Sequence, residues 1–116
     1  MLFSCSLKLN HIFRRLYSTK GTANAYFVLY ARRNRSDKNR VGITVGKKLG
    51  HAVVRNRVRR RIREIYRLHE TRFTPGWDIV VVARTRCVEA DFGKMTAAFL
   101  SLAQKSGLLR EPEVRP

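Results

Sequence analysis

The sequence predicts a single α+β domain, a small sheet packed against helices in the order α-β-β-α-β-α. Its 116 residues suit one domain, and a hydrophobic content of 44% is ordinary for a folded protein. Three short segments are rich in β-branched and aromatic residues, and one central segment has the apolar period of an amphipathic helix. We expect one domain over 1–116, with its core at about 8–109 and a polar tail at 110–116.

The first element is a helix that begins after Asn10, a residue type that caps helix N-termini. Its apolar residues recur at helical spacing, and Lys20-Gly21 ends it. These apolar residues are Ile12, Phe13, Leu16 and Tyr17. The segment 23–31 follows as a strand, in which Tyr26, Val28 and Tyr30 share one face and Phe27 and Leu29 share the other.

A second strand is predicted at 40–46, after the polar segment 32–39. Its residues Val41, Ile43 and Val45 share one face. Because the loop between the two strands is short, we expect them to pair as an antiparallel hairpin.

The longest helix is predicted over 52–69, after a break at 47–51. At 100° per residue, five apolar side chains fall within roughly 120° of one another and form a core-facing stripe. The stripe consists of Val54, Val58, Ile62, Ile65 and Leu68. The opposite arc consists of Arg55, Asn56, Arg59, Arg60, Arg63 and Arg67, and Arg57 and Arg61 lie at the border.

A turn at Pro75-Gly76 leads into a strand over 77–84 that is apolar on both faces, as expected of a central strand. The last helix begins near Asp91. Its apolar residues are Phe92, Met95, Phe99, Leu102 and Ala103, and Gly107 ends it.

The charge points to a polyanionic partner. There are 25 Lys and Arg against 8 Asp and Glu, a net charge of +17. Nucleic acid is the default partner, with an anionic membrane surface second. The segment 47–72 carries ten basic and two acidic residues, and every charged residue from 55 to 63 is Arg, which makes bidentate phosphate contacts and stacks on bases. Lys47 and Lys48 precede the first free N–H groups of the long helix and add a phosphate site.

Other kinds of site have little support. The eight acidic residues are scattered, and His11, His51 and His69 have no metal-ligand or catalytic spacing. Cys5 and Cys87 form no C-x-x-C pair, and we expect two reduced thiols, with a disulfide between them as the alternative. The first acidic residue is Asp37, a composition that an RNA-binding surface and a transit peptide share. No hydrophobic helix face is left over to bind a membrane.

The run from Val41 to Glu64, VGITVGKKLGHAVVRNRVRRRIRE, resembles the signature of the bacterial ribonuclease P protein subunit. That family has a strand, paired basic residues, Ala-Val and then Arg-Asn-Arg on a helix, and the resemblance covers about 8–109. It implies a small α-β sandwich with a left-handed βαβ crossover, like the second domain of ribosomal protein S5. Handedness rules alone predict a right-handed crossover. Residues 1–7 are uncharged, where the family usually has a basic stretch.

The resemblance also implies a function. The chain would bind the ribonuclease P catalytic RNA and the 5′ leader of precursor tRNA in the cytoplasm. The RNA subunit, with Mg²⁺ held mainly by that RNA, would cut the leader, and the protein would help to bind substrate and metal. No autonomous protein active site is expected, and no residue of the chain is singled out as a metal ligand. A structural, ribosomal-type RNA-binding protein is the alternative. RNA contacts are expected at what we call the arginine surface: Lys47, Lys48, Arg55, Asn56, Arg57, Arg59, Arg60, Arg63 and Arg67. Leader contacts are expected at what we call the aromatic site: Phe13, Tyr17 and Tyr30. Aromatic side chains beside a basic surface stack unpaired bases.

Overall fold

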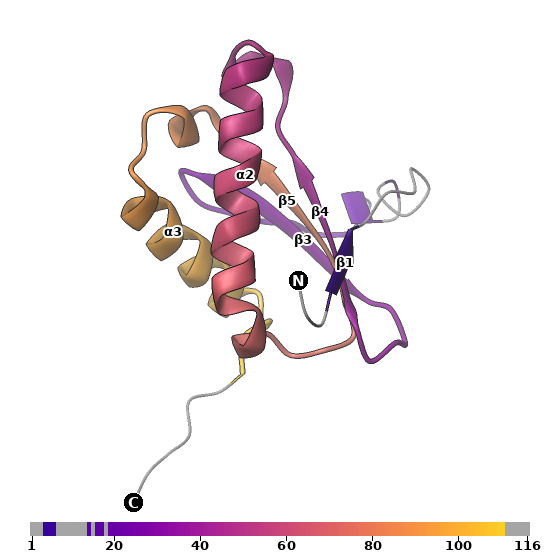
Figure 1. Ribbon diagram of the computed structural model, residues 1–116. Coiled ribbons are helices and arrows are strands. Elements are labelled where there is room, and N and C mark those ends of the chain that lie inside the picture. The colour runs from indigo at the N-terminus through magenta and orange to yellow at the C-terminus, as the bar shows by residue number, and fades with distance from the viewer. Residues whose placement is uncertain (1–3, 7–13, 15, 18, 111–116) are drawn as a thin grey trace, which may run out of the picture.

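The fold is a five-stranded sheet with two helices on one face, seen in a computed structural model that describes residues 4–6, 14, 16–17 and 19–110 (Figure 1). The sheet order is β1-β4-β5-β3-β2. The strands are β1 (Ser4–Ser6), β2 (Thr22–Ala23), β3 (Phe27–Arg33), β4 (Asn39–Thr44) and β5 (Trp77–Ala83). The helices are η1 (Lys47–Leu49), α2 (Ala52–His69), η2 (Glu70–Arg72), η3 (Thr85–Val88) and α3 (Phe92–Lys105). The α+β prediction is therefore confirmed.

The predicted β3–β4 hairpin is wrong, because β5 lies between the two strands. β5 pairs antiparallel with β3 and parallel with β4. Ile79, Val80 and Val81 of β5 are fully buried. Because their side chains point to both faces of the sheet, β5 has to be covered on both faces, which the central position provides. The five residues of the connecting turn reach about 17 Å when extended, enough to cross the roughly 10 Å of two strand spacings. The length of the loop therefore limits how far apart β3 and β4 can lie, but it does not require them to be neighbours in the sheet.

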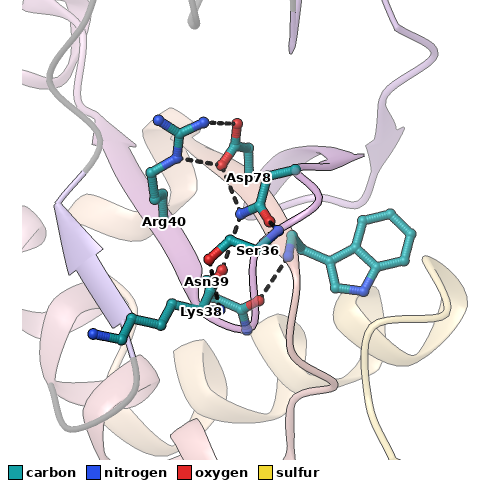
Figure 2. Close-up of polar contacts among 7 residues, drawn as sticks. Ser36, Lys38, Asn39, Arg40 and Asp78 are labelled. Carbon is teal, nitrogen blue, oxygen red and sulfur yellow. Dashed lines mark hydrogen bonds and ion pairs between the residues drawn. The ribbon is translucent and has the colours of Figure 1, made fainter.

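A polar cluster fastens this crossing turn over the start of β5 (Figure 2). Arg40 binds both carboxylate oxygens of Asp78, at 2.7 and 2.5 Å. The Asn34 amide donates to Asp78 and to the backbone oxygen of Lys38, at 3.0 and 2.9 Å. Asn39 Oδ1 accepts a bond from the Trp77 backbone N–H at 2.8 Å. The cluster thus ties the turn and the start of β4 to the first two residues of β5.

The β4–α2–β5 connection is left-handed, as the resemblance implies. In Figure 1 the parallel strands β4 and β5 both run upward, α2 crosses in front of them, and β5 lies to the left of β4. A right-handed connection would place β5 to the right.

The main core fills the space between the sheet and the two helices. Tyr66, Phe73, Phe99 and Phe27 form a chain of rings with centroids 4.9, 5.9 and 5.9 Å apart. Leu16 and Val80 form a second buried cluster on the other face of the sheet, with Tyr30 and Val82 against it. The protein therefore has a layer on each face of the sheet.

Several predicted boundaries are confirmed. The long helix covers 52–69, and Asp91 caps α3 by accepting a bond from the Lys94 backbone N–H at 2.8 Å. Gly107 follows α3 with φ +74°. Arg14, Leu16 and Tyr17 are helical, but the predicted cap Asn10 lies outside the described residues. No helix in the described part of the chain is long and apolar enough to cross a membrane.

Candidate nucleic-acid interface

The arginine surface begins at a tight turn that presents two lysines. η1 anchors itself through buried Leu49, while Lys47 and Lys48 are exposed beside the start of α2. Gly50 connects the two helices with φ +135°, and a Cβ there would lie 3.2 Å from the Val54 side chain. Glycine is therefore required for α2 to start directly after the lysines.

The buried face of α2 is rotated slightly from the predicted stripe. Val58, Ile62 and Ile65 are buried as predicted. Leu68 was predicted in the core but is 53% exposed, and Tyr66 is buried instead. Phe73 packs against the Tyr66 ring and so covers that flank of the helix.

The predicted arginine arc is confirmed as a solvent-facing surface. Asn56, Arg57, Arg60, Arg63 and Arg67 are exposed, and Arg55 and Arg59 are half-buried. Within the described residues the Arg55 Nε atom is buried without a hydrogen-bond partner.

Two contacts along this surface distinguish its arginines. Asn56 Oδ1 accepts a bond from Arg59 Nη1 at 2.8 Å, which orients that guanidinium. Arg67 forms a bidentate pair with Glu64, with Nε 2.9 Å from Oε2. The hydrogen bond from Arg67 lowers the pKa of Glu64 below its ordinary value. Arg67 is thus the member of the surface whose charge is already shared with a carboxylate.

The two border arginines fasten α2 to the segment around η3. Arg57 Nη2 donates to the Val88 carbonyl oxygen at 3.4 Å, and Arg61 Nη1 donates to the Ala90 carbonyl oxygen at 3.1 Å. Arg61 is half-buried, which confirms its border position.

Sequence reasoning missed Arg84 and Arg86, which lie at and in η3. Both are exposed, and η3 packs against both η1 and α2. The basic surface therefore continues beyond α2. The signal was the spacing Arg-Thr-Arg directly after the last strand, but nothing in the sequence showed that this segment returns to the long helix.

The aromatic site lies on the other face of the sheet. The Tyr17 and Tyr30 rings meet edge to face with centroids 5.1 Å apart, and the Tyr17 hydroxyl lies 3.2 Å from Thr44 Oγ1. Tyr17 is 42% exposed and Tyr30 is half-buried. Phe13 lies outside the described residues. Tyr26 precedes β3 and packs against the main core, so the expectation that it shares a face with Tyr30 is wrong.

The aromatic site and the arginine surface meet at the end of β4. Thr44, which contacts Tyr17, is the last residue of β4, and Lys47 begins η1. Lys47 therefore lies three residues along the chain from the threonine that the Tyr17 hydroxyl contacts.

Other chemistry finds little in the described residues. Cys87 is buried and free, and burial raises its thiol pKa to about 11, so it is a poor nucleophile. In the part of the chain that the structure describes, no three His, Cys, Asp or Glu side chains come together as metal ligands.

The comparisons with known proteins agree on one family. Residues 3–107 match the family model described as Ribonuclease P. The chain is 42% identical over 107 residues to the ribonuclease P protein component of Natranaerobius thermophilus. This alignment covers 91% of this chain and 93% of that protein. It is also 42% identical over 104 residues to the component from Clostridioides difficile, covering 88% and 91%.

Solved structures give the same answer. The Staphylococcus aureus RNase P protein superposes with a TM-score of 0.83 at 32% identity, covering 90% of this chain and 97% of that one. The Thermotoga maritima protein superposes with a TM-score of 0.79 at 33% identity, covering 86% and 96%.

Proposed function

The chain belongs to the ribonuclease P protein family, and we propose that it binds a ribonuclease P RNA and the 5′ leader of precursor tRNA. The family is the protein subunit of ribonuclease P. The observation that carries the proposal is the meeting of the arginine surface and the aromatic site at the end of β4. Cations are suited to the phosphates of a folded RNA, and rings are suited to the bases of an unpaired strand.

In this proposal the two surfaces divide the work. Arg57, Arg60 and Arg63 are exposed on one side of a rigid helix and contact the catalytic RNA. Tyr17 and Tyr30 stack leader bases, with Phe13 as a third contact. The protein thereby fixes the substrate relative to the RNA.

The cleavage itself is assigned to the RNA subunit, with Mg²⁺ held mainly by that RNA. The part of the chain that the structure describes holds no group of three metal-ligating side chains. Because its substrate is a precursor tRNA, we also propose that the protein acts in the cytoplasm. The alternative of a ribosomal-type structural protein is not favoured, since the relatives share the ribonuclease P name.

Reconstitution tests the proposal. Purified protein is added to a bacterial ribonuclease P RNA at a Mg²⁺ concentration at which the RNA alone cuts precursor tRNA slowly. We expect the protein to increase leader removal and to cut nothing without the RNA. Unchanged cleavage at every Mg²⁺ concentration, or cleavage by protein alone, would overturn the proposal.

A further inference from the structure

An open cavity of about 560 Å³ lies beside the arginine surface and is not part of the proposed function. Tyr26, η3 and the first turn of α3 line it, and its volume lies in the ordinary range for sites that hold small molecules. Its lining combines an aromatic ring, two cations and two carboxylates: Tyr26, Arg86, Lys94, Glu89 and Asp91. This mixture is unusual on a chain with only eight acidic residues.

The two carboxylates have different tasks. Asp91 Oδ1 accepts the Lys94 backbone N–H at 2.8 Å and so caps α3. Glu89 is exposed at the cavity and takes no part in that cap. A carboxylate accepts hydrogen bonds and donates none when ionised. Glu89 is therefore suited to a ligand edge that presents N–H groups.

Together with Glu89, the two cations and the Tyr26 ring provide the contacts that a nucleotide needs: a partner for its phosphate, a stacking surface for its base and an acceptor for its N–H groups. Arg86 and Lys94 suit a phosphate group, and the Tyr26 ring offers a stacking surface. The Tyr26 backbone is held, because its carbonyl oxygen accepts bonds from the Arg84 N–H at 2.8 Å and the Cys87 thiol at 3.0 Å. A bare phosphate makes no use of Glu89, and a simple cation is repelled by Arg86 and Lys94. Guanine, whose N1–H and N2–H₂ groups lie side by side, matches a carboxylate in a bidentate manner.

The cavity is continuous with the arginine surface. Val88 and Ala90 line it, and their carbonyl oxygens accept the bonds from Arg57 and Arg61. An RNA bound along α2 therefore passes close to the cavity mouth.

We propose that this cavity binds an unpaired guanine nucleotide of the RNA that docks on the arginine surface, with the base stacked on Tyr26 and paired with Glu89, and the phosphate on Arg86 and Lys94. The inference rests on the proposed function for the identity of the RNA. It adds a base-specific contact to a surface that otherwise binds phosphates.

The test uses the full-length chain and a bacterial ribonuclease P RNA. Glu89→Gln removes one negative charge, so electrostatics alone predicts equal or tighter RNA binding. The proposal predicts the opposite, a loss of affinity of about fivefold or more, because the paired edge is lost. Asp37→Asn is the matched control, since it removes the same charge from the exposed β3–β4 turn and leaves affinity equal or higher. Tyr26→Leu should cost about fivefold or more through lost stacking, with thermal melting confirming that the variant is folded.

A second measurement isolates the base. The amide resonances of residues 85–94 are followed during titration of the wild-type chain with guanosine 5′-monophosphate, adenosine 5′-monophosphate or inorganic phosphate. We expect the guanine nucleotide to bind at least about fivefold more tightly than the other two. Equal affinities would show a plain anion site, and unchanged or tighter RNA binding by Glu89→Gln would also overturn the inference. If the wild-type protein fails to bind the RNA, the proposed function fails, while the nucleotide titration still decides whether the cavity selects guanine.

Discussion

Arg60 and Arg67 form a matched pair that tests whether the arginine surface contacts phosphates directly. Both are exposed arginines of α2, and Ala at either position removes one unit of charge. Their surroundings differ, because Arg67 forms a bidentate pair with Glu64, whereas Arg60 forms no ion pair within the part of the chain that the structure describes. We expect Arg60→Ala to remove a phosphate contact. Arg67 is also among the RNA contacts expected from the sequence, but because Glu64 already holds its guanidinium we expect Arg67→Ala to remove none.

The magnitude follows from counterion release. Each phosphate contact contributes about 0.9 to the slope of log affinity against log salt on double-helical DNA, and we take the same figure for the helical parts of a folded RNA. Between about 50 and about 200 mM salt, one contact therefore changes affinity by about 3.5-fold. The affinity defect of Arg60→Ala should shrink by that factor across the range, and Arg67→Ala should keep the wild-type slope.

The assay is filter binding or fluorescence titration of a ribonuclease P RNA at four or more salt concentrations. Equal slope changes in the two variants would mean that the helix acts through net charge alone. A larger change for Arg67→Ala would mean that the pair with Glu64 opens on the RNA, and either result would refute the reasoning.

Three further predictions follow from single contacts. Asn56→Ala should weaken RNA binding by roughly two- to tenfold in the same titration, although it removes no charge, because Arg59 loses the oxygen that orients it. Tyr30→Ala should reduce affinity for precursor tRNA more than for mature tRNA, whereas Tyr30→Phe keeps the ring and the preference; equal loss for both RNAs in the Ala variant would place Tyr30 in a packing role only. The pKa of Cys87 is raised by burial to about 11 from 9.0, so the folded state disfavours the thiolate and loses stability as pH rises from about 9 towards 11. Urea unfolding at pH 8 and pH 10 should show a loss of about 1 kcal/mol that Cys87→Ala lacks.

The sequence was most informative where a pattern is local. The bounds of α2 follow from an unbroken 3.6-residue period, and the Asp91 cap follows from one side chain and the turn behind it. The central place of β5 also followed from its sequence, because a strand that is apolar on both faces has to be covered on both faces.

The sequence was least informative where a contact between two distant segments decides which side chains are buried. Leu68 lies at one edge of the predicted stripe and Tyr66 lies about 40° beyond the other edge, so periodicity favoured Leu68 and a small rotation of the helix exchanges the two. The choice is made by Phe73, which follows η2 and packs on the Tyr66 ring with centroids 4.9 Å apart. The hydrogen bonds that Arg57 and Arg61 donate likewise depend on a distant segment. Their acceptors lie at the end of η3 and just after it, a segment that follows β5 in the chain and packs against α2.

The mistaken hairpin shows why the two candidate RNA surfaces are neighbours. Parallel strands need a crossover connection, and here that connection is α2 itself. A crossover helix must begin near the C-terminal end of the strand before it, so the basic start of α2 lies close to the end of β4. Thr44 at that end contacts Tyr17, which lies on the face of the sheet opposite to α2. The parallel pairing of β4 with β5 is thus the feature of the fold that places the basic start of α2 next to the aromatic site.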